Sequence, residues 1–81
     1  MNIYVGNLHY GVRESDLKEI MEEYGTVSSA KLIMDRNTGR SKGFAFVEMD
    51  NDDEAKNAIS TLNGASLEGR DMVVKEALPR N

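Results

Sequence analysis

Apolar positions recur along the chain with two different periods. Four stretches alternate apolar with other side chains, as strands with one buried face do, and these are residues 2–6, 27–35, 42–49 and 71–77. Between them, residues 14–25 and 52–62 repeat apolar side chains every three or four positions, which is typical of amphipathic helices. The pattern predicts the order strand, helix, strand, strand, helix, strand.

Capping signals indicate where the two helices begin and end. Gly25 follows the first helical stretch, at a position where a C-cap glycine is common. Asn51 precedes the second stretch and has Glu54 three residues later, which predicts an N-cap with a capping-box partner. Asn63 and Gly64 then end this helix.

The second strand, residues 27–35, needs a bulge, because Val27 is out of step with the other apolar side chains of its face. With that bulge, three side chains face the core, namely Ala30, Leu32 and Met34. Residues 65–70 are expected to form a short turn region with Leu67 directed inward.

The order of elements predicts an α+β fold of the split βαβ (ferredoxin-like) type, a βαββαβ sandwich with an antiparallel four-stranded sheet and both helices on one face. Two helices cover only one face of such a sheet. The inward set is apolar throughout: Ile3, Val5, Ala30, Leu32, Ala45, Val47, Met49, Met72 and Val74. The open face carries three aromatic side chains that we call the aromatic platform: Tyr4, Phe44 and Phe46. Three lysines surround the platform: Lys31, Lys42 and Lys75.

The composition is that of one small domain spanning residues 1–81. The chain has one proline and no cysteine, which excludes disulfides, thiol catalysis and cysteine-ligated metals. No apolar run approaches the roughly 20 residues that cross a bilayer, and the first eight residues lack the basic opening of a signal peptide. We expect a cytoplasmic protein without membrane association.

The net charge of −4 argues against a polyanionic ligand until its distribution is considered. Residues 31–43 hold four basic residues against Asp35 alone, a local charge of +3 that includes Arg36 and Arg40. Residues 13–24 are net −3, and residues 50–54 contain four acids and no base. A molecule that is negative overall can therefore attract an anion on one face.

Aromatic rings among lysines on an uncovered sheet favour single-stranded nucleic acid as the ligand. Every nucleobase has a flat face, and stacking on an aromatic side chain contributes roughly 1–3 kcal/mol per base. The lysines are suited to phosphate. Bases in a duplex are already stacked on one another, so a single strand fits this arrangement better.

Two motifs on the predicted strands resemble those of a known family. Residues 42–49, KGFAFVEM, match six of the seven specified positions of the octamer of the RNA recognition motif, and IYVGNL at residues 3–8 is similar to that family's hexamer. The likeness runs from Asn2 to about Arg80 and includes the RNTGRSKG loop and the closing LNG, GR and V-x-x-A elements. The departure is Met49, where the family usually has an aromatic, and strand alternation directs Met49 into the core.

The resemblance implies roles for particular residues. It implies base stacking on Tyr4 and Phe44, a wedge against sugars or between nucleotides for Phe46, and a phosphate contact for Lys42. It also implies the strand order 4-1-3-2. That order places Lys75 beside Tyr4, and Lys31 beside Phe46 or its neighbours. Residues 77–80 are candidates for covering bound RNA.

The expected function is therefore binding of single-stranded RNA by a monomer, in RNA regulation or chaperoning. Arg36 and Arg40 are further candidates for RNA contact, with ordinary solvated loop charge as the alternative. Single-stranded DNA remains an alternative ligand. No cofactor, metal or catalytic residue is expected, because the chain has no phosphate loop, metal-ligand cluster or nucleophile motif.

The competing interpretation is a protein-interaction module, since some members of the family bind peptides through a helix face. The acidic first helix is the candidate surface for such a partner. Retention of the platform aromatics favours RNA.

Several other polar and aromatic residues have less direct interpretations. We expect Asn7 to hydrogen-bond the turn after the first strand, and Tyr10 and Tyr24 to be packing residues. His9 is not expected to be catalytic, although it is a candidate for stacking at the rim of the site. Glu48 lies on the open face. Two roles are considered for it, accepting a hydrogen bond from the amino group of a base and repelling phosphate, and the sequence favours neither.

Overall fold

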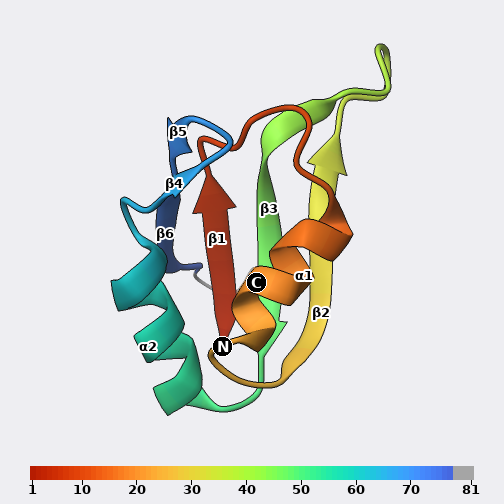
Figure 1. The fold of residues 1–81 in the computed structure, drawn as a ribbon. Coiled ribbons are helices and arrows are strands. Elements are labelled where there is room, and N and C mark those ends of the chain that lie inside the picture. The colour runs from red at the N-terminus through yellow and green to blue at the C-terminus, as the bar shows by residue number, and fades with distance from the viewer. Residues whose placement is uncertain (78–81) are drawn as a thin grey trace.

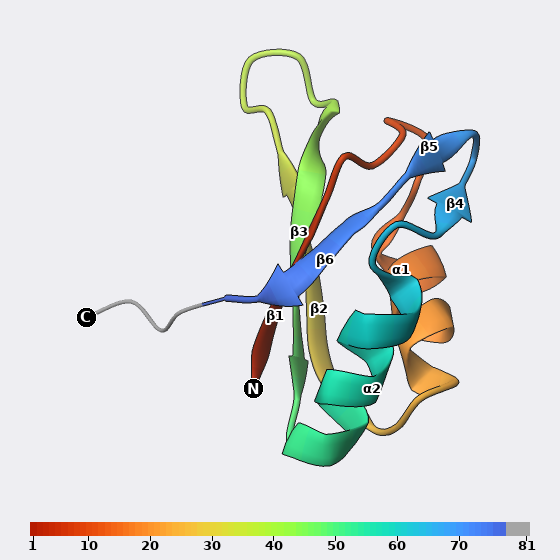
Figure 2. The ribbon, with the colours of Figure 1, turned by 90° about the vertical axis from the view of Figure 1, so that its left-hand side faces the viewer.

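A four-stranded antiparallel sheet and two helices form the two layers of the structure, a computed structural model that describes residues 1–77 (Figure 1). The elements in chain order are β1 (Asn2–Gly6), α1 (Glu14–Glu22), β2 (Val27–Met34), β3 (Ser41–Met49), α2 (Asp52–Leu62), β4 (Ser66–Leu67), β5 (Arg70–Asp71) and β6 (Val73–Glu76). The sheet has the order β2-β3-β1-β6, which is the predicted order read from the opposite edge. Seen along its edge, the sheet has both helices on one side (Figure 2). The predicted fold class is confirmed.

The core lies between the helices and the covered face of the sheet. Alternation along β3 buries Ala45, Val47 and Met49 completely, each with 0% exposure. Met49 therefore packs in the interior, as its parity predicts, and does not belong to the open face. Val74 of β6 and Met72, just before that strand, are buried as expected. Within the described residues, neither helix is long and apolar enough to cross a membrane.

The second strand departs from simple alternation twice. The register with β3 shifts between Val27 and Ser29, which confirms the predicted bulge. A second shift lies between Leu32 and Met34, so that Met34 pairs with Ser41 and is 47% exposed. The prediction that Met34 faces the core is wrong, because the period of two does not continue through the second shift.

Gly25 does not cap the first helix. Helix α1 ends at Glu22 with Glu23 as its C-cap, and Gly25 is not among the residues with positive φ. A Cβ at Gly25 would overlap the carboxylate of Glu54, which accepts a hydrogen bond from the backbone N–H of Thr26 at 3.4 Å. The glycine is therefore required for close approach of a side chain from α2.

The second helix begins and ends where the sequence predicts. The Asn51 side chain accepts a hydrogen bond from the backbone N–H of Glu54 at 3.0 Å, so the N-cap is confirmed. The Glu54 carboxylate is directed toward Thr26 and does not complete the expected capping box. Gly64, with φ of 87°, follows the C-cap Asn63.

A small hairpin replaces the turn region expected after α2. Strands β4 and β5 pair through Ser66 with Asp71 and Leu67 with Arg70. Glu68 and Gly69 between them both have positive φ, 52° and 80°, as in a two-residue hairpin turn. Leu67 is partly buried against the core, as predicted.

Candidate nucleic-acid interface

The three platform aromatics form one continuous cluster on the open face of the sheet. Tyr4 of β1 lies opposite Phe46 of β3 in the strand register. The Tyr4 ring centroid lies 6.0 Å from that of Phe44 and 5.9 Å from that of Phe46, and the two phenylalanine centroids are 6.1 Å apart. All three side chains are half-buried. Their remaining exposed surface is available to flat ligands.

The absence of a side chain at Gly6 determines how Tyr4 lies. Gly6 and Tyr4 share the open face of β1, and a Cβ built on Gly6 would be 2.5 Å from the Tyr4 hydroxyl and 2.6 Å from its nearest ring carbon. The tyrosine ring therefore lies over Gly6. This position brings the ring within about 6 Å of both phenylalanines.

Two of the predicted lysines flank the platform from neighbouring strands. Lys75 of β6 pairs with Tyr4 in the register, and its Nζ lies 5.4 Å from the Tyr4 ring centroid, in cation–π range. Lys31 of β2 lies opposite Phe46. Both lysines are exposed. The predicted placements are confirmed, while contact of these lysines with RNA stays a prediction.

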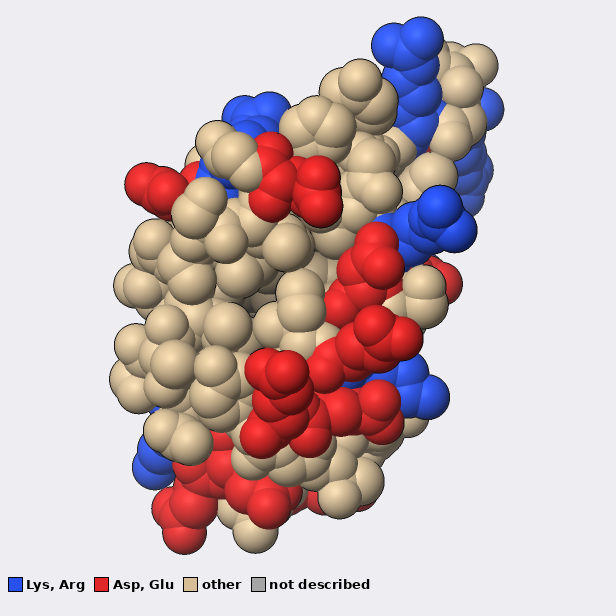
Figure 3. Space-filling model, in the orientation of Figure 1, with Lys and Arg blue, Asp and Glu red and all other residues tan. Residues whose placement is uncertain are grey.

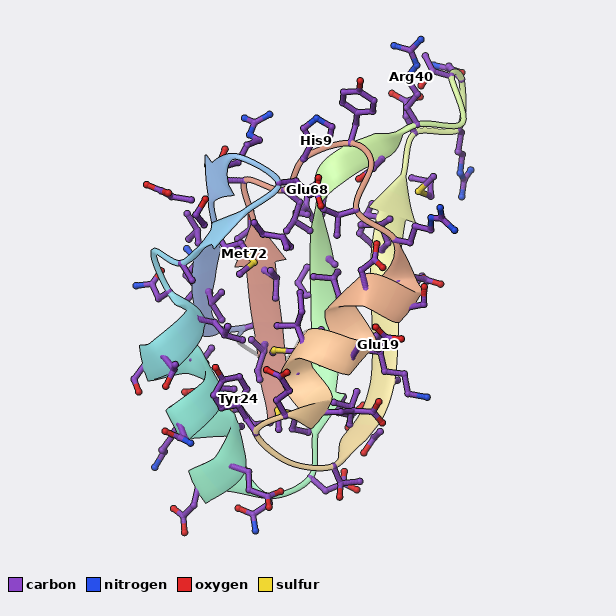
Figure 4. The ribbon with its side chains drawn as sticks, in the orientation of Figure 1. His9, Glu19, Tyr24, Arg40, Glu68 and Met72 are labelled. Carbon is purple, nitrogen blue, oxygen red and sulfur yellow. The ribbon has the colours of Figure 1, made fainter. Side chains whose placement is uncertain are left out.

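The remaining basic candidates lie toward one end of the sheet. Lys42 is exposed at the start of β3. Arg36 and Arg40 belong to the loop between β2 and β3, which projects past the end of the sheet (Figures 1 and 4). The Asp35 carboxylate shapes this loop by accepting a hydrogen bond from the backbone N–H of Asn37 at 2.7 Å. The structure does not place the two arginines against the platform.

A pocket of about 330 Å³ adjoins the platform at this same end, where the loop after β1, the start of β3 and the β4–β5 hairpin meet. We call it the end pocket. Its lining combines two platform rings with residues from those three segments: Tyr4, Asn7, Leu8, Tyr10, Ser41, Lys42, Gly43, Phe44 and Arg70. Tyr10 and Arg70 were not predicted as site residues.

Asn7 holds the hairpin against the loop that follows β1. Its Nδ2 donates to the backbone carbonyl of Asp71 at 2.7 Å, and its Oδ1 accepts a hydrogen bond from the Arg70 guanidinium at 2.9 Å. Asn7 has φ of 57°, a conformation that asparagine tolerates better than most residues. The expected structural role is present, although the partner is the hairpin and not the turn after β1.

The two tyrosines outside the platform differ from each other. Tyr24 is partly buried against the core, as predicted. Tyr10 is 71% exposed, so the prediction that it packs inside is wrong. Its ring stacks on His9 with centroids 4.3 Å apart, on the loop that carries both residues past the end of β1 (Figure 4).

The helix-covered side of the molecule is acidic, in contrast to the lysines that flank the platform. Acidic side chains run along α1 on this face (Figure 3). Two of them stabilise the chain locally. The Glu14 carboxylate accepts a hydrogen bond from the backbone N–H of Leu32 at 2.8 Å, and the Asp16 carboxylate accepts one from the backbone N–H of Arg13 at 3.0 Å. On the open face, Glu48 is the exposed acid of β3.

The last predicted contact segment is described only in part. Ala77 donates its backbone N–H to the carbonyl of Asn2 at 2.8 Å, which continues the pairing of β6 with β1. Residues 78–80 lie outside the described residues, so contact between this segment and RNA stays a prediction.

Comparisons with known proteins agree on one family. The sequence profile described as the RNA recognition motif matches residues 3–73. The chain is 51% identical over 80 residues to RbpA of Synechocystis sp., which is named as an RNA-binding protein, and the match covers 99% of this chain and 79% of RbpA. Among solved structures, the crystal structure of RNA Binding Protein PG1 superposes with a TM-score of 0.95 at 54% identity, covering 100% of this chain and 98% of that one. The structure titled Rna15 RRM with bound RNA (GU) has a TM-score of 0.85 at 30% identity, covering 94% and 81%.

Proposed function

The chain belongs to the RNA recognition motif family, and from that premise we propose that it binds single-stranded RNA across the open face of its sheet. The observation that carries the proposal is the aromatic platform, three adjoining rings on a face that neither helix covers. Water-exposed aromatic surface of this kind marks a binding site more often than it serves packing.

Each part of the face has a role in this proposal. Tyr4 and Phe44 stack one base each, and Phe46, nearly perpendicular to Phe44 at 85°, contacts a sugar or separates neighbouring nucleotides. Lys31, Lys42 and Lys75 contact phosphates. Arg36 and Arg40 supply longer-range attraction from the loop.

The acidic helix face makes the orientation of the RNA specific. A phosphate backbone approaching α1 meets the row of carboxylates shown in Figure 3, whereas the open face presents lysines. Repulsion on one side and attraction on the other favour the platform side during encounter. The proposal therefore assigns α1 to stability and orientation.

We expect modest affinity from so few stacked bases. Two or three bases at roughly 1–3 kcal/mol each, together with a few phosphate contacts and less the cost of ordering the strand, place the dissociation constant near the micromolar scale, about 8 kcal/mol. We further propose that the protein acts as a monomer in the cytoplasm, in RNA regulation or chaperoning, without catalytic activity. Single-stranded DNA is the alternative ligand whose affinity should be compared with that of RNA.

The test is a binding titration with short random-sequence RNA, single-stranded in one arm and annealed to its complement in the other. Saturable binding of the single strand, with duplex binding at least about tenfold weaker, is expected because paired bases are not free to stack on the platform. Equal binding of both forms would contradict stacking. Failure of both forms to bind would favour the alternative, a peptide partner for the helix face.

A further inference from the structure

The end pocket contains more binding chemistry than the platform requires. Of the platform rings, Tyr4 and Phe44 form one side of the pocket, while Asn7, Tyr10 and Arg70 come from segments that the stacking of bases on the sheet does not use. Its volume of about 330 Å³ lies at the lower end of the range for small-molecule pockets, roughly 300–1,000 Å³.

Arg70 is held in a defined orientation at this pocket. Its guanidinium donates to Asn7 Oδ1 at 2.9 Å, which uses one of its five N–H donors. Asn7 is itself anchored through its other amide atom, which donates to Asp71 at 2.7 Å. A guanidinium restrained in this way loses less conformational entropy when it binds an anion, because part of its ordering is already complete.

The charge of the lining indicates an anion. Lys42 and Arg70 are the two residues of the lining with charged side chains, and both are basic and exposed. One comes from the start of β3 and the other from β5, so their convergence depends on the fold and not on a basic run in the sequence. Phosphate is the anion that a nucleic-acid strand crossing the platform delivers at this position.

Tyr10 provides an aromatic surface on the same pocket. Its side chain is 71% exposed, and its ring stacks on His9 at 4.3 Å between centroids. A ring supported on one face by another ring is restricted in its motion, and its other face is suited to a base. The pocket thus combines one aromatic surface with two cations, beside the end of the platform.

We propose that the end pocket is a subsite for one further nucleotide, with its base against Tyr10 and its phosphate between Arg70 and Lys42. This inference rests on the proposed function, because the platform must first bring the strand to the pocket. It adds a specific prediction about the length of the RNA. An RNA just long enough for the platform gains affinity when one nucleotide is added at the end that enters the pocket.

The experiment measures dissociation constants for single-stranded RNAs that are lengthened one nucleotide at a time, at either end. The proteins are the unsubstituted chain, Arg70→Gln, Tyr10→Ala and the control Lys56→Gln, which removes the same charge from the exposed side of α2. For the unsubstituted chain and the control, we expect one added nucleotide at one end to increase affinity by about tenfold. Arg70→Gln and Tyr10→Ala should lose this increase and bind the shorter RNA with unchanged affinity.

Replacing a single phosphate tests the anion contact independently of protein folding. An RNA with one uncharged methylphosphonate linkage at the added nucleotide should bind the unsubstituted chain and Arg70→Gln equally. Two results would overturn the subsite while the platform proposal stands. One is that Arg70→Gln binds RNA of every length more weakly than the unsubstituted chain does. The other is that both pocket variants keep the full gain in affinity when one nucleotide is added. Loss of all binding by the unsubstituted chain would overturn both.

Discussion

The two faces of the sheet use hydrophobic residues for different purposes, and strand β3 shows the difference within a few residues. Ala45, Val47 and Met49 point to the helices and are completely buried. Phe44 and Phe46, which alternate with them, lie on the face that neither helix covers and remain half-buried. The covered face is filled by the protein itself, whereas the open face has room for a ligand. Substitutions on the two faces should therefore change different measured quantities.

The largest effect is expected on the covered face. Ile3→Ala removes a completely buried side chain of the core and should lower the free energy of unfolding by about 2–5 kcal/mol. Denaturant unfolding measures this loss. Where the variant is still folded, its RNA affinity should be unchanged, and a specific loss of affinity in the folded fraction would mean that the faces are assigned incorrectly.

Phe44→Ala should show the reverse of Ile3→Ala, a loss of RNA affinity with little change in stability. Removing a platform ring deletes a stacking surface worth roughly 1–3 kcal/mol per base, so affinity for single-stranded RNA should fall at least about tenfold. The free energy of unfolding should change little, because the ring is not part of the core. Ala45, next in sequence and buried, supplies the matched control, since Ala45→Gly should weaken folding without a stacking loss. Unfolding of Phe44→Ala would show that this ring packs inside.

Gly6→Ala tests whether RNA affinity depends on the position of the Tyr4 ring as well as on its presence. The added methyl group meets the Tyr4 ring, so Tyr4 must move away from its place beside the two phenylalanines. We expect affinity to fall by roughly threefold to tenfold, part of one stacking contribution. In a Tyr4→Ala background the same substitution should have no effect on affinity. A loss of equal size in both backgrounds would assign Gly6 to folding alone.

The smallest expected effect concerns the lysines. With about two to four phosphates engaged on a single strand, the slope of log affinity against log salt concentration should be roughly −1.4 to −2.8. Lys75→Gln should make the slope shallower by about 0.7, the contribution of one phosphate, and Lys56→Gln on the helix face should leave it unchanged. A slope unaltered by Lys75→Gln would remove this residue from the interface.

Much of the fold and of the platform follows from local sequence patterns. Strand alternation is enough to separate Phe44 and Phe46 from Ala45 and Val47, and it correctly directs Met49 inward. The bulge at Val27 is predictable for the same reason, because the residue breaks an otherwise regular alternation.

The features that sequence patterns miss depend on distant partners. Met34 turns outward because of a register shift against β3. A glycine is needed at position 25 because the Glu54 side chain, from α2, occupies the space that a Cβ would take. The end pocket brings together Asn7 and Arg70, which are hydrogen-bonded although they lie 63 positions apart in the sequence. The GR pair is visible as a motif, but its position beside Lys42 requires the folded hairpin.

The most direct test of the central claim is to follow the backbone amide chemical shifts while the protein is titrated with short random-sequence single-stranded RNA. The proposed function predicts perturbations centred on β1 and β3, strongest at Tyr4, Phe44 and Phe46, with the exposed amides of α1 unaffected. Perturbation confined to α1, with the three platform residues unchanged, would contradict it.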